Sequence, residues 1–345
     1  MLNLRDHTPE SLVSALPSLR PAVARRLTSR VVANDRDDWE DVPGLSNRAK
    51  DTLKRESRTE RLTVLDRRKS AVDPFVKYLL RTSDGQLLET VRIPLERPRY
   101  SVCVSSQVGC ALGCVFCETG RLGFTRNLEP WEIVEQVLTI RREASDRPVT
   151  GAVFQGQGEP FQNYENVIRA AEIMSHPCGL RLRGDRITIS TVGLLPQIER
   201  YTTEGHPYRL ILSLTSAIQE KRERLVPTAE RYAVADLATA MRRHAERTRS
   251  YVNVAWVLMA GVNSEPQEAK ELRRLFDGCK VRVSVIDVND PIGRFQRADD
   301  AERGRFLAAL ADNGLGFVRR YSGCPDIHAA CGMLASSARG GATVY

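Results

Sequence analysis

The chain has 345 residues, of which 42% are hydrophobic and 27% charged, and its formal net charge is +8. This composition is typical of a soluble globular protein that buries a full core, and the positive charge favours a polyanionic partner. No apolar run approaches the roughly 20 residues that span a membrane, and the early charges at Arg5 and Asp6 leave no apolar signal region. We therefore expect a cytoplasmic monomer with no membrane partner.

Short helices are predicted from residue 1 to about residue 65. Thr8-Pro9-Glu10 is typical of a helix start, and the tight turn at 42–46 precedes a helix for which Leu53 is one apolar anchor. Basic residues outnumber acidic ones between Lys54 and Lys69. This stretch suits contact with nucleic-acid phosphates or a solvated helix face, and its charge alone does not separate the two.

A β-hairpin is predicted over residues 75–95. Apolar residues alternate on both sides of a turn at Ser83-Asp84-Gly85, which is the pattern of two short half-buried strands.

From residue 100 onward, β-rich runs alternate with helical stretches. Strands are expected at 102–105, 151–155, 186–190, 209–214, 252–259, 281–287 and near Phe317. The expected helices between them include 130–142, 164–174, 233–247 and 266–276. Such repeated units predict an α/β fold with a parallel sheet covered by helices, either a doubly wound sheet or a partial barrel.

Three cysteines, Cys110, Cys114 and Cys117, form a C-x3-C-x2-C run directly after the first of these strands. Three closely spaced thiolates leave one position of a metal centre open. A 4Fe-4S cluster suits this pattern, because its fourth iron can bind the amino and carboxylate groups of a ligand.

Two simpler interpretations compete with a cluster. A zinc site needs a fourth ligand, and the five histidines lie far from the run, although a distant one could close the site. Buried unreactive thiols are common in cores, but three within one short glycine-rich segment are a poor core pattern. The eight cysteines of the chain favour metal ligation or redox catalysis over a disulfide scaffold.

Polar clusters follow several of the predicted strands. They are GQGEP at 156–160, STVG at 190–193, SLT at 213–215, and Asn289. Because the carboxyl ends of parallel strands form one active-site rim, these loops and the cysteine run are expected to converge on one face.

With these motifs the chain resembles the RlmN/Cfr family of radical S-adenosylmethionine enzymes, which methylate adenine carbons in RNA. The strongest match is CVSSQVGCALGCVFCETGRLGFTRNL at 103–128, and GVNS at 261–264 and DIHAACGML at 326–334 also match. The resemblance implies a partial (β/α)6 barrel of the radical S-adenosylmethionine type at 100–345. A basic RNA-binding helical domain at 1–70 and a β-hairpin linker at 71–99 would precede it.

The resemblance also implies the binding residues. The 4Fe-4S cluster would be ligated by Cys110, Cys114 and Cys117. S-adenosylmethionine would be contacted by Gly158, Glu159, Ser190, Ser213, Leu214, Thr215 and Asn289.

Three further residues match catalytic positions of the family. Cys331 matches a cysteine that is first methylated on sulfur, and Cys103 matches the cysteine that resolves the protein–substrate adduct through a disulfide. Glu89 matches a carboxylate assigned to proton transfer. This route is chemically reasonable because an adenine ring carbon has no lone pair that could attack a sulfonium, whereas a thiol can accept the methyl group.

The implied substrate is 23S rRNA, at carbon 2 of adenine, with transfer RNA as a second substrate and flavodoxin or ferredoxin as electron donor. Departures from the family pattern occur at Gln157, Thr215, Asp287 and Cys324. They leave two alternatives open, the same chemistry on another nucleic-acid site or small aromatic metabolite, and a non-catalytic RNA-binding protein with a structural metal. Cys324 is either a redox neighbour of Cys331 or a packing residue.

Overall fold

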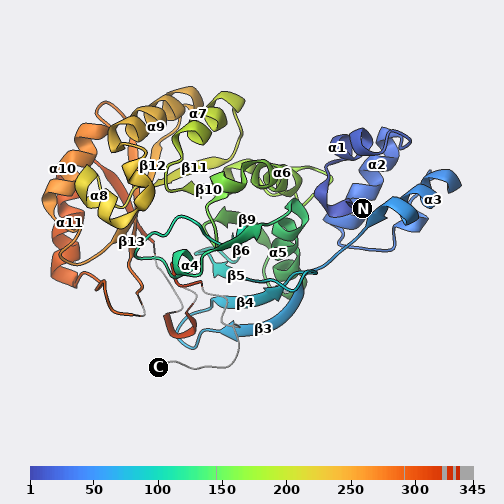
Figure 1. Cartoon of the computed structure of the whole chain (residues 1–345), viewed down its shortest axis with the longest axis horizontal. Helices are drawn as coiled ribbons and strands as arrows, with labels where there is room; N and C mark the ends of the chain where they lie inside the picture. The colour runs from blue at the N-terminus through green and yellow to red at the C-terminus, as the bar shows by residue number, and fades with distance from the viewer. Residues whose placement is uncertain (145, 291, 321–324, 329–331, 335–345) are drawn as a thin grey trace.

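The computed structural model describes every residue except 145, 291, 321–324, 329–331 and 335–345. Cys324 and Cys331, both singled out by the sequence, lie outside the described residues. The chain forms a small N-terminal lobe beside a larger body that is built on one sheet (Figure 1).

Ten strands form the sheet of the body, in the spatial order β14-β13-β12-β11-β10-β9-β6-β5-β4-β3. The parallel strands are β6 (Tyr100–Val104), β9 (Val149–Phe154), β10 (Ile187–Thr191), β11 (Arg209–Ser213), β12 (Val252–Leu258), β13 (Val281–Asp287) and β14 (Gly316–Arg320). The antiparallel strands are β5 (Leu87–Pro94), β4 (Val76–Arg81) and β3 (Thr63–Lys69). The strands predicted from 100 onward and the predicted hairpin are confirmed.

The parallel strands follow one another across the sheet in chain order. A doubly wound sheet would reverse its order near the middle, so this order favours the singly wound, barrel-like alternative. Helices pack along the outer side of the sheet in Figure 1. The long ones are α5 (Pro130–Glu143), α6 (Tyr164–Ser175), α7 (Leu195–Glu204), α9 (Val234–Thr248), α10 (Pro266–Leu275) and α11 (Asp300–Asp312), and the short ones are α4 (Glu118–Arg121) and α8 (Gln219–Leu225).

Successive side chains of each strand point to opposite faces of the sheet, so one set packs in the core beneath the helices and the other set lies on the concave face. On β12, Val254 and Trp256 belong to the large core beneath the helices. Ala255 lies between them in sequence and instead packs with Ile211 and Ile286 in a small separate cluster. The concave side therefore carries its own small set of side chains, and Ile286 of this set lines a cavity inside the curved sheet.

One segment differs from its prediction. Helices were expected to about residue 65, but Thr63–Lys69 forms β3, an edge strand that pairs with β4. Most of its side chains are exposed, so the apolar alternation that marks a half-buried strand is missing. Of the two interpretations of the basic stretch, the solvated helix face applies only to its first residues, because the helix that contains Lys54 ends at Glu56.

The N-terminal lobe contains α1 (Pro9–Ala15), α2 (Pro21–Thr28) and α3 (Asn47–Glu56), and the short strands β1 (Leu2–Asn3) and β2 (Ser57–Arg58) pair beside them. The predicted helix starts are confirmed. The Thr8 hydroxyl accepts from the Ser11 N–H at 3.3 Å, and the Ser46 hydroxyl accepts from the Ala49 N–H at 3.2 Å. Leu53 is fully buried in the small core of the lobe, as its role as an anchor requires.

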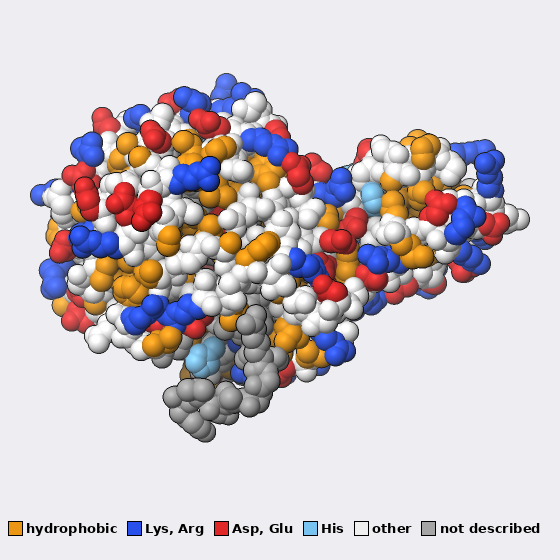
Figure 2. Space-filling view, in the orientation of Figure 1, with side chains coloured by type: hydrophobic (Ala, Val, Ile, Leu, Met, Phe, Trp, Pro, Cys, Tyr) orange, Lys and Arg blue, Asp and Glu red, His pale blue; other side chains and the backbone are white. Residues whose placement is uncertain are grey.

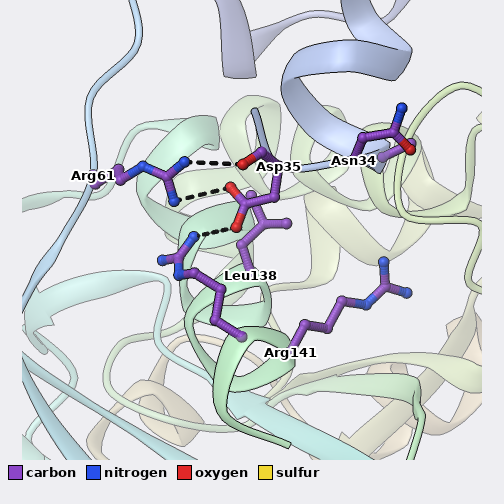
Figure 3. A pocket seen from close by; sticks show the side chains of 7 residues that line it. Asn34, Asp35, Arg61, Leu138 and Arg141 are labelled. Carbon is purple, nitrogen blue, oxygen red and sulfur yellow. Dashed lines mark hydrogen bonds and ion pairs between the residues drawn. The ribbon is translucent and has the colours of Figure 1, made fainter. Parts of the chain in front are cut away.

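A charge network joins the lobe to the body. Asp35 lies between two guanidinium groups (Figure 3), 3.0 Å from Arg61 and 2.6 Å from Arg142 of α5. The fully buried Arg5 lies 3.0 Å from Asp35 and 3.8 Å from Glu135 of α5. Arg61 and Arg142 line a pocket of about 410 Å³ and both face Asp35, whereas Arg141 of the same pocket donates to the Leu180 carbonyl. We assign the network a structural role at the junction.

The basic stretch is also largely neutralised within the chain. Acidic and basic side chains are interspersed over the lobe and the body in Figure 2. Between Lys54 and Lys69, ion pairs are formed by Lys54, Arg55, Arg58, Arg61, Arg67 and Arg68. The net field that this stretch presents is therefore smaller than its count of basic residues suggests.

None of the helices in the described ranges has the length and apolar character that a membrane crossing requires.

Candidate active site

The cysteine loop begins just beyond β6 and is closed by a two-stranded hairpin. β7 (Gln107–Gly109) pairs antiparallel with β8 (Phe124–Asn127), and the Cys110 N–H donates to the Gly123 carbonyl at 2.9 Å. Gly109 has φ +76°, and a Cβ there would overlap the Gly123 carbonyl oxygen. Glycine at 109 therefore allows the hairpin to close around the loop that carries the three cysteines.

The three thiols lie in an apolar shell. Cys114 is buried and packs in a cluster with Leu225 and Met259, and Cys110 and Cys117 pack partly buried against the same cluster. Burial raises the pKa of Cys110 to about 11, and burial together with the neighbouring thiols raises the pKa of Cys114. A thiol in this setting ionises when a positively charged centre stabilises its thiolate.

The arrangement of these cysteines suits a cluster better than a single ion. Among the residues with described positions, no group of three or more His, Cys, Asp or Glu side chains is placed to hold one metal ion. Three cysteines that each bind a different iron do not need to converge on one point, so the same finding leaves a three-cysteine cluster open.

The GQGEP loop packs directly against the start of the cysteine loop. A Cβ at Gly156 would lie 2.7 Å from the Val104 carbonyl oxygen, and a Cβ at Gly158 would lie 2.5 Å from the Gln107 Cβ. Between them Gln157 is fully buried, and its Oε1 accepts from the Glu89 N–H at 3.1 Å. This departure from the family pattern thus forms a link between the loop after β9 and the middle of β5.

Glu159 holds two backbone segments through its carboxylate. Its oxygens accept from the Phe161 N–H and from the Val192 N–H, each at 2.9 Å. Burial raises the pKa of Glu159 to about 7, although both hydrogen bonds act in the opposite direction. The side chain therefore orders the loop after β10, and its backbone N–H donates to Gln107 Oε1 at 2.9 Å.

The predicted residues at the ends of β10, β11 and β13 lie on the same side of the body. Ser190 Oγ and Ser213 Oγ are 3.0 Å apart. Leu214 is buried, and its N–H donates to the Ala255 carbonyl at 3.1 Å. Asn289 is buried after β13, and its side-chain oxygen accepts from Arg297.

Thr215 is the most strained of these residues. It is fully buried with φ +65°, a conformation that a β-branched residue rarely adopts. Its Oγ1 is buried, and no partner for it occurs among the described residues. A buried hydroxyl without a partner among the described residues, on a strained turn, is compatible with a binding site for a polar ligand such as S-adenosylmethionine.

Sequence reasoning missed Arg222 of α8, which ties the same loops together. Arg222 is almost completely buried, and its guanidinium donates to the carbonyls of Val192, Leu214 and Ser213, the last at 3.2 Å. Burial lowers the pKa of Arg222 to about 10. No carboxylate pairs with it among the described residues. Its role could not be seen in the sequence, because the carbonyls it bonds belong to main chain 8 to 30 residues away.

Cys103 and Glu89 lie close to each other on neighbouring strands. Cys103 of β6 is opposite Val91 of β5, two residues beyond Glu89. Glu89 is fully buried, and the Lys77 Nζ lies 2.9 Å from its Oε1. This lysine partner could not be predicted from the sequence, because strand alternation alone does not show which polar side chains meet.

The C-terminal segment is anchored on both sides of its undescribed part. Asp326 accepts from the Ser70 hydroxyl and the Ala71 N–H, each at 2.8 Å, and Lys77 Nζ donates to the His328 carbonyl at 3.1 Å. Beyond it, the Gly332 carbonyl accepts from the Glu118 N–H at 2.7 Å. His328 therefore lies against β4, and Gly332 lies against the start of α4, directly after Cys117.

A cavity of about 890 Å³ connects the two cysteine sites. It is lined by Cys103 and Cys117, by Val91 and Val153 of the sheet, and by Leu334 of the C-terminal segment. Asp287, another departure from the family pattern, does not line it. The Asp287 carboxylate lies 3.0 Å from Arg319 and 3.8 Å from Arg303, so it joins β13 to β14 and α11.

Comparison with known proteins identifies the class. The model of the radical SAM superfamily matches residues 104–275, which contain the cysteine loop and all the strand-end loops up to β12. A crystal structure of a radical SAM methyltransferase from Sphaerobacter thermophilus is 35% identical, with a TM-score of 0.89 over 98% of this chain and 100% of that one. The chain is thus a radical SAM enzyme with the α/β fold of that superfamily, which implies a 4Fe-4S cluster and S-adenosylmethionine.

Curated relatives identify the family within this class. A probable RNA methyltransferase of Myxococcus xanthus is 43% identical over 99% of this chain and 96% of its own length. The dual-specificity RNA methyltransferase RlmN of Syntrophotalea carbinolica is 36% identical over 96% of this chain and 89% of its own. The chain belongs to the RlmN-type radical SAM RNA methyltransferases.

Proposed function

We propose that this enzyme methylates a ring carbon of adenine, most directly carbon 2, in 23S rRNA and in transfer RNA. The observation that carries the proposal is the shared cavity, in which Cys103 faces the same space as Cys117 of the cysteine loop. A resolving cysteine must reach the protein–substrate adduct, and the position of Cys103 in this cavity supports that role.

The cysteine loop would hold the cofactors. Cys110, Cys114 and Cys117 would ligate the cluster, and the loops at Gly158, Ser190, Ser213, Thr215 and Asn289 would bind S-adenosylmethionine. When bound, these groups supply a methyl group and one-electron radical chemistry. The apolar shell around the thiols would keep water away, and flavodoxin or ferredoxin would supply electrons.

The remaining roles fall to residues of the chain itself. Cys331 would accept a methyl group on its sulfur and later carry the carbon that joins the base. Cys103 would attack the Cys331 sulfur of the adduct, so that a disulfide forms and the methylated product leaves. Glu89 would exchange a proton with the substrate or adduct, and Lys77 would hold its carboxylate in place.

Isotopic labelling tests which carbon reacts. RNA transcribed with adenosine deuterated at carbon 2, or in a parallel sample at carbon 8, is incubated with the reconstituted enzyme, reductant and S-adenosylmethionine. We expect methyladenosine that has lost deuterium only in the first sample, as seen by mass spectrometry of the digested nucleosides. Loss only in the second sample would assign carbon 8 and overturn the assignment to carbon 2.

A mixed-acceptor experiment tests the substrate class. S-adenosylmethionine labelled in its methyl group is offered with total RNA and with a small-molecule extract. We expect the label in 23S rRNA and transfer RNA. Label confined to the small molecules would overturn the RNA assignment in favour of an aromatic metabolite.

A further inference from the structure

The cavity that holds Cys103 extends to the opposite end of the strands, where arginines gather. Arg99 directly precedes β6, Arg186 directly precedes β10, and Arg209 is the first residue of β11. Arg97 lies beside them in the connection from β5 to β6, and Arg320 lines the cavity from the end of β14. We call Arg97, Arg99, Arg186 and Arg209 the arginine rim.

The charges of these arginines are not neutralised by the described part of the chain. None of the four rim residues, nor Arg320, forms an ion pair with a carboxylate of a described residue. Their recorded partners are neutral: Arg209 donates to the Asp185 carbonyl at 3.1 Å, and Arg320 donates to Gln155 Oε1 at 3.3 Å. The acidic residues that line the cavity are Asp73, Glu96 and Asp185. Asp185 is paired with Arg183 at 2.9 Å, and its charge also acts on Arg186 and Arg209.

Arg209 of the rim is also close enough to Arg320 for their charges to repel each other. Burial lowers the pKa of Arg209, the charges of Arg282 and Arg320 lower it further, and the charge of Asp185 acts in the opposite direction. The basic stretch of the N-terminal lobe behaves differently, because most of its side chains are paired. Five arginines and three acidic residues therefore line the cavity, and this excess of positive charge favours binding of an anion.

The ligand chemistry follows from the guanidinium groups and the shape of the cavity. Planar guanidinium groups bind phosphate with two parallel hydrogen bonds, and several of them around one opening suit a ligand with more than one phosphate. A cavity of about 890 Å³ can hold a single nucleoside but not a base-paired helix. The target base must therefore leave its stack before it enters.

We propose that the arginine rim binds backbone phosphates of the substrate RNA, so that the target base enters through the end of the sheet where the strands begin. A base that enters past the rim would then meet Cys103 deeper in the same cavity. This inference rests on the proposed function for the nature of the acceptor, and it adds the entry route and the residues that bind the phosphates.

A double variant tests the rim. Arg186→Gln/Arg209→Gln removes two charges from exposed strand starts, and Arg242→Gln/Arg305→Gln removes two charges from the outer helices α9 and α11 as a matched control. Binding of a fluorescent RNA stem-loop that contains an unpaired adenosine is measured by anisotropy over a series of salt concentrations. For single-stranded RNA, each phosphate contact contributes roughly 0.7 to the slope of log affinity against log salt.

We expect the rim variant to lose about tenfold in affinity and about 1.4 in slope, while the control keeps both values. Arg186→Lys/Arg209→Lys should restore most of the slope, because the charge returns without the planar geometry. An unchanged slope in a rim variant with normal far-UV circular dichroism would overturn the proposal.

Binding of two ligands, adenosine 5'-monophosphate and RNA, is compared with methylation, so that failure of the rim proposal can be told apart from failure of the proposed function. If adenosine 5'-monophosphate binding depends on the rim but RNA binding does not, the site serves a free nucleotide and the proposal is wrong. If RNA binding depends on the rim but no adenine carbon is methylated, the rim is supported and the proposed function fails. In methylation assays the rim variant should raise KM about tenfold with kcat unchanged, because only binding is altered.

Discussion

The Lys77 ammonium lies 2.9 Å from the Glu89 carboxylate, and both side chains are almost completely buried between β4 and β5. The same ammonium donates to the His328 carbonyl, so one lysine joins the candidate proton-transfer residue to the C-terminal segment. Buried lysines are uncommon, and this one is placed where it can order two parts of the site at once.

Lys77→Met is expected to destabilise the protein and to lower methylation at least tenfold. The substitution leaves the buried Glu89 without this counter-charge, and breaking one side of a buried pair costs about 3–5 kcal/mol. Urea denaturation measures the loss. The double variant Lys77→Met/Glu89→Gln should recover most of the stability but not the activity. Equal stability of Lys77→Met and the parent chain would contradict the pairing.

Gln157→Met, which restores the residue usual in the family, is expected to cost about 1 kcal/mol of unfolding free energy. The reason is the lost hydrogen bond from the Glu89 N–H, which would then face an apolar side chain. Iron content after reconstitution should not change, because the substitution removes a side-chain hydrogen bond to β5 and keeps the backbone hydrogen bonds of residue 157 to Ser106 and Gln107. A more stable variant would show that Gln157 does not hold Glu89.

Arg222→Met is expected to lower stability by about 3 kcal/mol or more, because it leaves several buried carbonyls without their charged donor. Arg224→Met on the same helix α8 is the control, since Arg224 is exposed. Chemical denaturation and iron analysis after anaerobic reconstitution provide the measurements. We expect less retained iron only for Arg222→Met, and equal behaviour of the two variants would argue against a role in ordering the loops.

The junction between lobe and body should respond to pH through Asp6. Burial raises the pKa of Asp6 to about 7, and its carboxylate accepts from the Trp131 N–H at 2.6 Å. The folded state therefore keeps a proton that the unfolded chain releases near pH 4. The contribution of Asp6 to stability is complete below that pH and is lost as the pH rises toward 7.

Asp6→Asn should remove this loss. The variant should gain stability relative to the parent chain between pH 5 and pH 8, with a difference on the order of 4 kcal/mol above pH 7. The contribution of His7 to stability increases with pH, opposite to that of Asp6, because burial lowers the pKa of His7 to about 4. Comparison of the variant with the parent at each pH isolates Asp6, and a difference that does not grow with pH would show that its carboxyl titrates normally.

Much of the fold was predictable because its signals are local. Glycine-containing loops after β-rich runs mark the ends of β9 and β10, and each predicted parallel strand lies within two residues of its position. β3 was missed because its exposed, charged side chains lack alternation. The placement of Lys77 and Arg222 depends on contacts between distant segments, which no local pattern records.

The departures at Gln157 and Asp287 also became clear only in three dimensions. The sequence showed that they differ from the family, but it did not show that one side chain bonds to β5 and the other pairs with Arg319. The curvature of the sheet, which brings the rim arginines to one opening, likewise follows from the order of the strands and not from any single motif.

The most direct test of the proposed chemistry uses the Cys103→Ala variant with reconstituted cluster, reductant, S-adenosylmethionine and RNA. We expect a covalent protein–RNA complex that survives denaturing electrophoresis and that does not form when Cys331→Ala is also present. Free methylated RNA from the Cys103→Ala variant, with no covalent complex, would contradict the two-cysteine route.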